Sequence, residues 1–267
     1  MNERAATHSP APPALWHVDE GRALFAGPLQ RNAPHRHSVP VYLAALYGSF
    51  QLRIKGAAWL SCRTAVVPTG IAYEFDMRGE PLAVIYLEPN VAGADALVPL
   101  VSGAREVGGA LVGSTGEVSA LRTLYERRDA RADIAPALQA LTHFSERKAY
   151  RNLDPRVARA VAAMQTGEAA ATPVAEMAAA AGLSASRFQH VFTEHVGVPF
   201  RRYRAWHRLR AAIREVVEGS SYTAAAHAAG FADQAHFARE FRRTFGAPAS
   251  QGLAGRRATS PFSATLP

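Results

Sequence analysis

The pattern of apolar positions divides the chain into a β-rich first part and a helical second part. Residues 41–54 read VYLAALYGSFQLRI, which is rich in β-branched and aromatic residues and has a Gly-Ser turn in its middle. Residues 64–75 (TAVVPTGIAYEF) and 81–89 (PLAVIYLEP) have the same character. Short strands at this spacing predict a small barrel or sandwich between about residues 20 and 90. Residues 91–115 are rich in Gly and Ala and favour no element.

From about residue 117 the apolar positions follow a helical period, in two stripes. The stripes predict two helices that form an antiparallel hairpin. This hairpin either packs on the β-rich part, which is the default expectation, or pairs with a second copy of the chain. The stripes are formed by Val118, Leu121, Leu124 and Tyr125 and by Ile134, Leu138, Leu141 and Phe144.

Residues 151–155 (RNLDP) have the character of a linker and helix start, and one pattern occurs twice beyond them. Residues 181–197 read AGLSASRFQHVFTEHVG, and residues 229–246 read AGFADQAHFAREFRRTFG. Each copy has an Ala-Gly pair, two Phe four residues apart, a Gly five later and a Pro two further on. The repeat predicts two similar supersecondary units, and the i, i+4 spacing points the Phe side chains inward.

Each copy also contains the start and stop signals of a helix, a short turn and a second helix. Residues 200–219 (FRRYRAWHRLRAAIREVVEG) lie between the copies and predict one long helix, since they contain no Pro and no internal Gly. Eighteen helical residues span about 27 Å, and major grooves on one face of B-DNA repeat about every 34 Å. A rod of this length could therefore hold two reading helices over adjacent grooves. The expected N-caps are Thr172 (ahead of Pro173), Ser184, Ser221 and Asp233, and the expected stops are Gly182 and Gly230.

The net charge of +8 is concentrated in the helical part. Residues 1–153 hold 16 Lys and Arg against 14 Asp and Glu, whereas residues 154–267 hold 14 against 8. This excess coincides with the repeat and favours an acidic partner, most simply double-stranded DNA. A solvated basic surface would explain the charge but not the repeat.

The remaining bulk features favour a cytoplasmic protein. Cys62 is the only cysteine, so an internal disulfide is excluded and a reducing compartment is favoured. The N-terminal stretch MNERAATHSPAPPAL has no apolar core of signal-peptide length. No apolar run reaches the roughly 18 residues of a membrane span, so no membrane partner is expected.

The helical part resembles the DNA-binding domain of AraC/XylS-type bacterial transcription regulators. The resemblance is carried by AEMAAAAGLSASRFQHVFTEHVGVPFRRYRAWHRLRAA and by AAHAAGFADQAHFAREFRRTFGAPAS. The second stretch has Gly-Phe, Asp, His-Phe, Arg, Phe, Phe-Gly and Pro at spacings that match the family. The β-rich part is similar to the cupin-like barrel of many such regulators.

The resemblance implies an α+β two-domain fold. Residues 1–150 would form an N-terminal cupin-like β-barrel followed by helices, which senses an effector and can carry a dimer interface. Residues 151–255 would form a C-terminal all-α domain with two helix-turn-helix units joined by a long helix, and residues 256–267 would be a tail.

In this family the second helix of each unit enters the major groove, which assigns site residues by position. Gln can bond adenine and Arg can bond guanine with two hydrogen bonds each. Two candidates, Ser186 and Ala235, are small, so readout there leans on the other positions and on DNA shape. The base-contact candidates are Ser186, Arg187, Gln189, His190, Gln234, Ala235, His236 and Arg239. The phosphate-contact candidates are Arg201, Arg202, Arg204, Arg208, Arg242 and Arg243.

His35 and His37 form an H-x-H pair whose rings point to one side if the segment is a strand. A metal cupin needs further ligands, but no Glu follows His37 closely, and Tyr73 stands near where a later His would be. We therefore expect no metal and no cofactor, and a pair that is structural or lines a pocket. The effector-pocket candidates are Tyr42, Tyr47, Tyr73, Phe75 and Tyr86, with His35 and His37 at the rim.

We interpret the chain as a sequence-specific transcription regulator, not an enzyme, controlled by a small molecule in the N-terminal barrel. Its expected partners are double-stranded DNA, that effector, a second copy of the chain and, if it activates transcription, RNA polymerase. One alternative is a cupin-type metalloenzyme with an appended helical domain, which bound metal and turnover would favour. Another is a nucleoid-type binder with little preference among DNA sequences.

Overall fold

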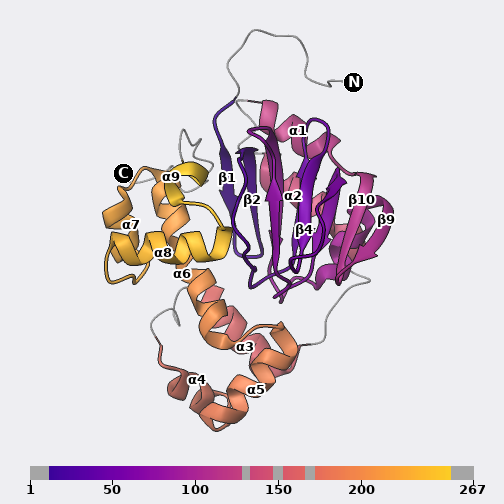
Figure 1. Ribbon diagram of the computed structural model, residues 1–267. Coiled ribbons are helices and arrows are strands. Elements are labelled where there is room, and N and C mark those ends of the chain that lie inside the picture. Colours follow the sequence, from indigo (N-terminus) through magenta and orange to yellow (C-terminus); the bar gives the residue numbers. More distant parts are fainter. Residues whose placement is uncertain (1–11, 128–132, 147–152, 166–171, 254–267) are drawn as a thin grey trace.

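The computed structural model describes residues 12–127, 133–146, 153–165 and 172–253, and side chains except those of residues 143–146. The chain forms a β-rich N-terminal unit and a helical C-terminal unit (Figure 1). The expected boundary near residue 150, the tail 256–267 and the Phe144 side chain lie outside this description. Within it, no helix is long and apolar enough to cross a membrane.

The N-terminal unit consists of two antiparallel sheets. The larger sheet has the strand order β1-β2-β8-β3-β6-β10-β9 and is not closed on itself, and the smaller has the order β5-β4-β7. In the larger sheet the bounds are β1 (Leu15–Val18), β2 (Arg22–Pro28), β3 (Val41–Ala45), β6 (Thr64–Val67), β8 (Pro81–Leu87), β9 (Val101–Val107) and β10 (Ala110–Gly116). In the smaller sheet they are β4 (Phe50–Ile54), β5 (Leu60–Cys62) and β7 (Tyr73–Asp76).

Both faces of the larger sheet are covered, so strand β8 is buried along its whole length. One face carries Phe25 and Val84 and shares a core with Leu52 of the smaller sheet. The other face carries Leu24 and Ile85 and shares a core with three helices. The two helical stripes therefore pack on the β-rich unit, as expected by default. These helices are α1 (Ser119–Glu126), α2 (Ile134–Glu146) and the 3-10 helix η1 (Ala94–Leu100).

Two features of this unit differ from the sequence pattern. The Gly-rich segment that favoured no element forms η1, β9 and β10. The apolar run over residues 64–75 is two strands, because the turn at Pro68–Gly70 carries the chain from the larger sheet to the smaller. Gly70 has a φ of 80° in this turn, a backbone conformation that glycine adopts at low cost.

The C-terminal unit has the predicted double helix-turn-helix arrangement. Ser184, Ser221 and Asp233 accept hydrogen bonds from backbone N–H groups at the starts of their helices, which confirms three of the four expected caps. The fourth was wrong, because Pro173 and not Thr172 takes the N-cap position. The helices are α3 (Pro155–Gln165), α4 (Val174–Ala180), α5 (Ala185–Val196), α6 (Phe200–Glu218), α7 (Tyr222–Ala228), α8 (Gln234–Phe245) and α9 (Ala249–Gly252).

Candidate DNA interface and interdomain cavity

Helices α5 and α8 are the second helices of the two units, and both expose the side chains predicted to read bases. Their Phe residues face inward: Phe188 in α5 and Phe237 in α8 are almost fully buried. Of the eight base-contact candidates, only His236 is half-buried. The exposed ones are Ser186, Arg187, Gln189 and His190 in α5 and Gln234, Ala235 and Arg239 in α8.

Some of these side chains have local contacts that a base would replace. Gln189 Nε2 lies 3.4 Å from the carbonyl of Ala185, one turn back. Gln234 Oε1 accepts a hydrogen bond of 2.8 Å from Thr223 Oγ1 in α7. Both contacts are exposed, so exchanging them for contacts to a base costs little. Arg187 and Arg239 extend from the same two faces and complete a donor-rich surface on each helix.

The six phosphate candidates separate by exposure. Three of the candidates are half-buried and lie against other parts of the protein. Arg204 Nη1, for example, donates a hydrogen bond to the carbonyl of Thr172, 3.0 Å away. The exposed group is better placed to reach a DNA backbone. The exposed residues are Arg201, Arg242 and Arg243, and the half-buried ones are Arg202, Arg204 and Arg208.

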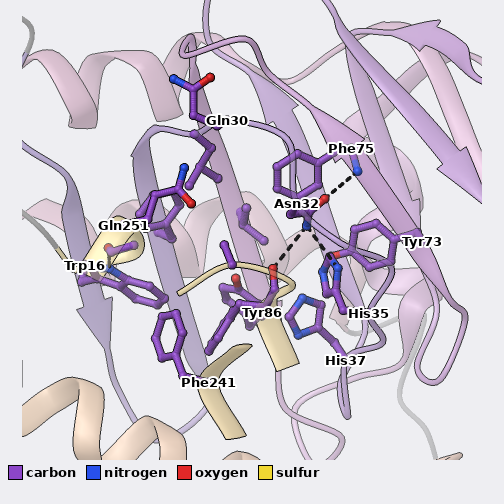
Figure 2. Close-up of a pocket in the computed structure, with 16 residues that line it drawn as sticks. Trp16, Gln30, Asn32, His35, His37, Tyr73, Phe75, Tyr86, Phe241 and Gln251 are labelled. Carbon is purple, nitrogen blue, oxygen red and sulfur yellow. Dashed lines mark hydrogen bonds between the residues drawn. The ribbon is translucent and has the colours of Figure 1, made fainter. Parts of the chain in front are cut away.

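An aromatic cavity of about 40 Å³ lies where α8 and α9 meet the N-terminal unit. Figure 2 shows that its walls come from both units. Five of the seven pocket candidates line it, together with residues that the sequence did not single out. The predicted residues are His35, His37, Tyr73, Phe75 and Tyr86. The others include Trp16, Gln30, Asn32, Phe241, Phe245 and Gln251.

Tyr42 and Tyr47 do not line this cavity, so their assignment to an effector pocket is corrected. Tyr42 points to the opposite face of the larger sheet, where its hydroxyl lies within hydrogen-bond distance of the carbonyls of Glu117 (2.8 Å) and Leu100 (3.0 Å). Tyr47 lies past the end of β3, and its hydroxyl donates to the Glu126 carboxylate. Side chains alternate along a strand, and both faces of this sheet are covered, so the aromatic pattern alone did not identify the cavity face.

The two histidines are buried inside the cavity wall and not at its rim. Burial lowers the pKa of His35 to about 4. Burial, with a further contribution from His35, holds the pKa of His37 well below its ordinary value, so both rings are neutral at pH 7. The backbone carbonyl of Ala33 and the amide of Asn32 lie 3.0 and 3.1 Å from His35 Nδ1. His37 Nδ1 is buried and has no hydrogen-bond partner among the described residues, so it is one polar group available to a ligand.

The size of the cavity restricts what it holds in this arrangement. About 40 Å³ is room for a few water molecules, whereas drug-sized ligands occupy sites of roughly 300–1,000 Å³. The histidine pair has no set of metal ligands around it: within the described residues, no three His, Cys, Asp or Glu side chains are grouped to hold an ion.

Hydrogen bonds fasten the second helix-turn-helix unit to the wall of this cavity. Asn32 Nδ2 donates to the carbonyl of Phe245 (3.2 Å), and the backbone N–H of Ala33 donates to the carbonyl of Gly246 (2.8 Å). Trp16 Nε1 donates to the carbonyl of Gly252 in α9 (2.8 Å). Any movement of α8 away from the strands would break these bonds and open the cavity.

A buried carboxylate at the end of β8, Glu88, fastens the long helix α6 to the N-terminal unit. Glu88 Oε1 accepts from Arg210 Nη1 (2.5 Å) and Trp206 Nε1 (2.7 Å), and Oε2 accepts from Tyr203 Oη (2.7 Å). His207 Nε2 lies 3.4 Å from Oε2. Arg210 also donates to the backbone carbonyl of Asp19, so it joins α6 to the β1–β2 turn as well.

This cluster controls the charge on Glu88. Burial by itself would raise the pKa of Glu88, but the Arg210 charge, the neighbouring His207 and the hydrogen bond from Tyr203 outweigh burial and lower it to about 2. One pattern in the sequence, not used in the predictions, points to this cluster of side chains around Glu88. Its four partners, Tyr203, Trp206, His207 and Arg210, recur at i, i+3, i+4 and i+7 on the apolar stripe of α6. An Arg on such a stripe requires a buried acid as its partner.

A known family model matches part of the C-terminal unit. Residues 177–254 match a family model described as a helix-turn-helix domain. No protein of curated function gives a significant match to the chain.

Across both units, the fold is similar to solved structures of ToxT from Vibrio cholerae. ToxT with a bound unsaturated fatty acid is 14% identical, covers 90% of this chain and 97% of its own, and has a TM-score of 0.57. An apo ToxT variant is 12% identical over 90% and 99% of the two chains, with a TM-score of 0.58. ToxT bound to (E)-4-(8-methylnaphthalen-1-yl)but-3-enoic acid is 13% identical over 87% and 98%, with a TM-score of 0.56. At these identities the likeness establishes the fold. The helix-turn-helix match over residues 177–254 and the shared two-domain fold agree with the resemblance of the helical part to AraC/XylS-type transcription regulators.

Proposed function

We propose that the chain is a sequence-specific DNA-binding transcription regulator whose N-terminal unit binds a small-molecule effector. The observation that carries the proposal is the pair of outward-facing, donor-rich helices α5 and α8 at equivalent places in two repeated units. Helix α6 joins the units and has 19 residues, a length of about 28 Å. This length suits two readers in successive major grooves on one face of B-DNA.

The side chains divide into readers and positioning groups. Arg187 and Gln189 of α5 and Arg239 of α8 are exposed and can each make two hydrogen bonds to a base edge. Arg201 and Arg242 are exposed and contact phosphates, which sets the register of the protein on the duplex without reading sequence.

The aromatic cavity is the proposed effector site. ToxT has been solved with an unsaturated fatty acid and with a naphthalenyl butenoic acid, which makes a small apolar acid a reasonable class of effector to test here. Because Phe241 and Phe245 form one wall, a ligand larger than the present 40 Å³ must displace α8 from the strands. Such a ligand has different affinities for the docked and displaced arrangements, which is the condition for an effector to control DNA binding.

We propose that the protein acts without turnover. His35 is hydrogen-bonded to the Asn32 amide and to a backbone carbonyl, and the metalloenzyme alternative would need further ligands beside the His35–His37 pair. Action in the cytoplasm, assembly of two copies and contact with RNA polymerase belong to the same proposal.

Selection of bound sites from a random duplex library, at two salt concentrations, tests the proposal. We expect a motif of two parts about one DNA turn apart. Gln189→Ala should relax the part read by α5, and Arg239→Ala the part read by α8, each by about 5- to 150-fold, or about 1–3 kcal/mol. Arg105→Ala, an exposed change on β9 far from both readers, should leave the motif intact.

Binding without sequence preference would contradict the regulator proposal. If no motif is enriched and binding only weakens with salt, phosphate attraction alone accounts for it, and the regulator proposal fails. Metal binding and turnover by the His35–His37 unit would then be assayed.

A further inference from the structure

A hydrogen bond joins the two helices of the second helix-turn-helix unit at the start of its reading helix. Thr223 Oγ1, in the first turn of α7, donates to Gln234 Oε1, in the first turn of α8, at 2.8 Å. Both side chains are exposed, so the pair lies on the surface of the unit and not in its core. The backbone beside Gln234 is fixed as well, because Asp233 Oδ1 accepts from the backbone N–H of His236 at 2.6 Å. Gln234 is therefore held both at its backbone and at its side-chain oxygen.

The first helix-turn-helix unit has alanine at both equivalent positions. Thr223 is the second residue of α7, and the second residue of α4 is Ala175. Gln234 is the first residue of α8, and the first residue of α5 is Ala185. The helices nevertheless keep their lengths, since α4 and α7 have 7 residues each and α5 and α8 have 12 each. A unit of this kind therefore forms without the polar pair, so the pair is available for a role in recognition.

The hydrogen bond separates the acceptor of the Gln234 amide from its donors. The Thr223 hydroxyl occupies Oε1, which leaves the two N–H donors of Nε2 for a base. Guanine presents two acceptors in the major groove, N7 and O6, whereas adenine presents the N7 acceptor beside the N6 donor. A contact to guanine therefore leaves the Thr223 hydrogen bond in place, while the two-bond contact to adenine needs Oε1 and must displace or share it. Displacement costs little at an exposed contact, but it is enough to separate the two bases severalfold.

We propose that Thr223 is a positioning residue that makes Gln234 select guanine over adenine in the part of the DNA site read by α8. The inference rests on the proposed function and assigns a base to one of its readers. A side chain that is ordered before binding also loses less conformational freedom when it meets the base, which favours the same contact. Without the Thr223 hydroxyl, the Gln234 amide can rotate and use both its donor and its acceptor, which is the pattern that adenine matches.

Competition binding of the full chain to short duplexes tests this assignment. The site selected from the random library supplies the parent duplex, and Gln234→Ala identifies the base pair that Gln234 reads as the one at which preference relaxes. Four duplexes that differ only at this pair are then compared. We expect the wild type to bind the guanine duplex about three- to tenfold more tightly than the adenine duplex, which is the effect of one hydrogen bond.

Two variants of Thr223 separate its hydroxyl from its shape. Thr223→Val removes the hydroxyl and keeps the branched side chain, so it should abolish the guanine preference at this pair or turn it toward adenine. Thr223→Ser keeps the hydroxyl and should retain the guanine preference. The part of the site read by α5, whose unit has alanines at the equivalent positions, is the control within the same molecule and should keep its preferences. The melting temperature and the salt slope should also stay nearly unchanged, because Thr223 is exposed and uncharged.

Several results would overturn the role of Thr223 while the regulator proposal stands. They are an adenine preference in the wild type, an unchanged guanine preference in Thr223→Val, and a Gln234→Ala variant that relaxes no position of the motif. An equal loss of affinity for all four duplexes in Thr223→Val, together with a lower melting temperature, would show that Thr223 only supports the packing of α7 and α8, which overturns it as well. If the wild type selects no DNA motif, the regulator proposal itself fails and this inference fails with it.

Discussion

Replacing Glu88 with alanine is expected to lower the free energy of unfolding by about 3–5 kcal/mol, the usual cost of breaking a buried ion pair. The change leaves Arg210 buried without its counter-charge and leaves the Tyr203 and Trp206 donors without their acceptor. Trp206 reports the change directly, because its indole contacts Glu88 and its fluorescence responds to release of α6. Urea unfolding followed at this signal gives the midpoint and the free energy.

Two further variants isolate the carboxylate. Glu106→Ala removes an exposed acid on β9 and should change stability by no more than about 0.5 kcal/mol. Glu88→Ala combined with Arg210→Met should be more stable than Glu88→Ala alone, because the uncompensated buried charge is gone. Equal stability of Glu88→Ala and Glu106→Ala would mean that this cluster does not hold α6 on the sheet.

The same carboxylate predicts a pH dependence. Its pKa falls from an ordinary 4.5 to about 2 in the folded protein. A lowered carboxyl pKa stabilises the fold above the unfolded value, and this contribution is lost as the pH falls through the folded value. Wild type should therefore lose about 3 kcal/mol between pH 5 and pH 2 that Glu88→Gln, already weakened at pH 5, does not lose. Parallel pH profiles of the two proteins would contradict this assignment.

The Glu88 cluster and the hydrogen bonds around the aromatic cavity fasten the C-terminal unit at two separate places. The partners of Glu88 on α6 lie near the middle of the helix that joins the two reading units. The hydrogen bonds from Asn32, Ala33 and Trp16 hold the end of α8 and helix α9, at a place separate from the Glu88 cluster. Displacement of α8 from the aromatic cavity would therefore leave the anchor of α6 at Glu88 in place, and it would change the geometry of one reader relative to the other.

The sequence predicted those parts of the molecule that depend on local signals. The repeat, the caps at Ser184, Ser221 and Asp233 and the inward Phe pairs are set by residues within a few positions of one another. Each is a property of one helix or one turn, so no knowledge of tertiary contacts was required.

The parts that the sequence did not predict depend on contacts between distant residues. Glu88 meets Arg210 122 positions later, and the cavity needs α8 and α9 to dock on β1, which a linear pattern does not encode. The choice between Tyr42 and Tyr86 as cavity residues depends on which sheet face meets the C-terminal unit. Strands β9 and β10 were missed because their Gly-rich sequence has weak strand propensity, and pairing with β6 overrides it.

Gly246→Ala is expected to destabilise the protein by about 2–5 kcal/mol and to release the end of α8 from the N-terminal unit. Gly246 has a φ of 70°, so any other residue there pays the cost of the left-handed backbone conformation. A Cβ would in addition lie 2.3 Å from the carbonyl oxygen of Ala33 and 2.9 Å from His35 Nδ1, so the two segments must separate. Hydrogen exchange at the Ala33 amide measures this separation, because that N–H donates to the Gly246 carbonyl.

Gly197→Ala is the matched control, because the repeat places Gly197 at the equivalent end of α5 with a φ of 90°. A Cβ there has its nearest contact at 3.4 Å, on the Thr69 side chain, so this variant is destabilised by the backbone conformation alone and not by a collision. The difference between the two variants, about 1–3 kcal/mol, then measures the close approach of α8 to the cavity wall. If both variants lose the same stability and the Ala33 amide exchanges equally fast in the wild type and in both variants, α8 does not dock closely, and an effector in the aromatic cavity has no direct route to the second reader.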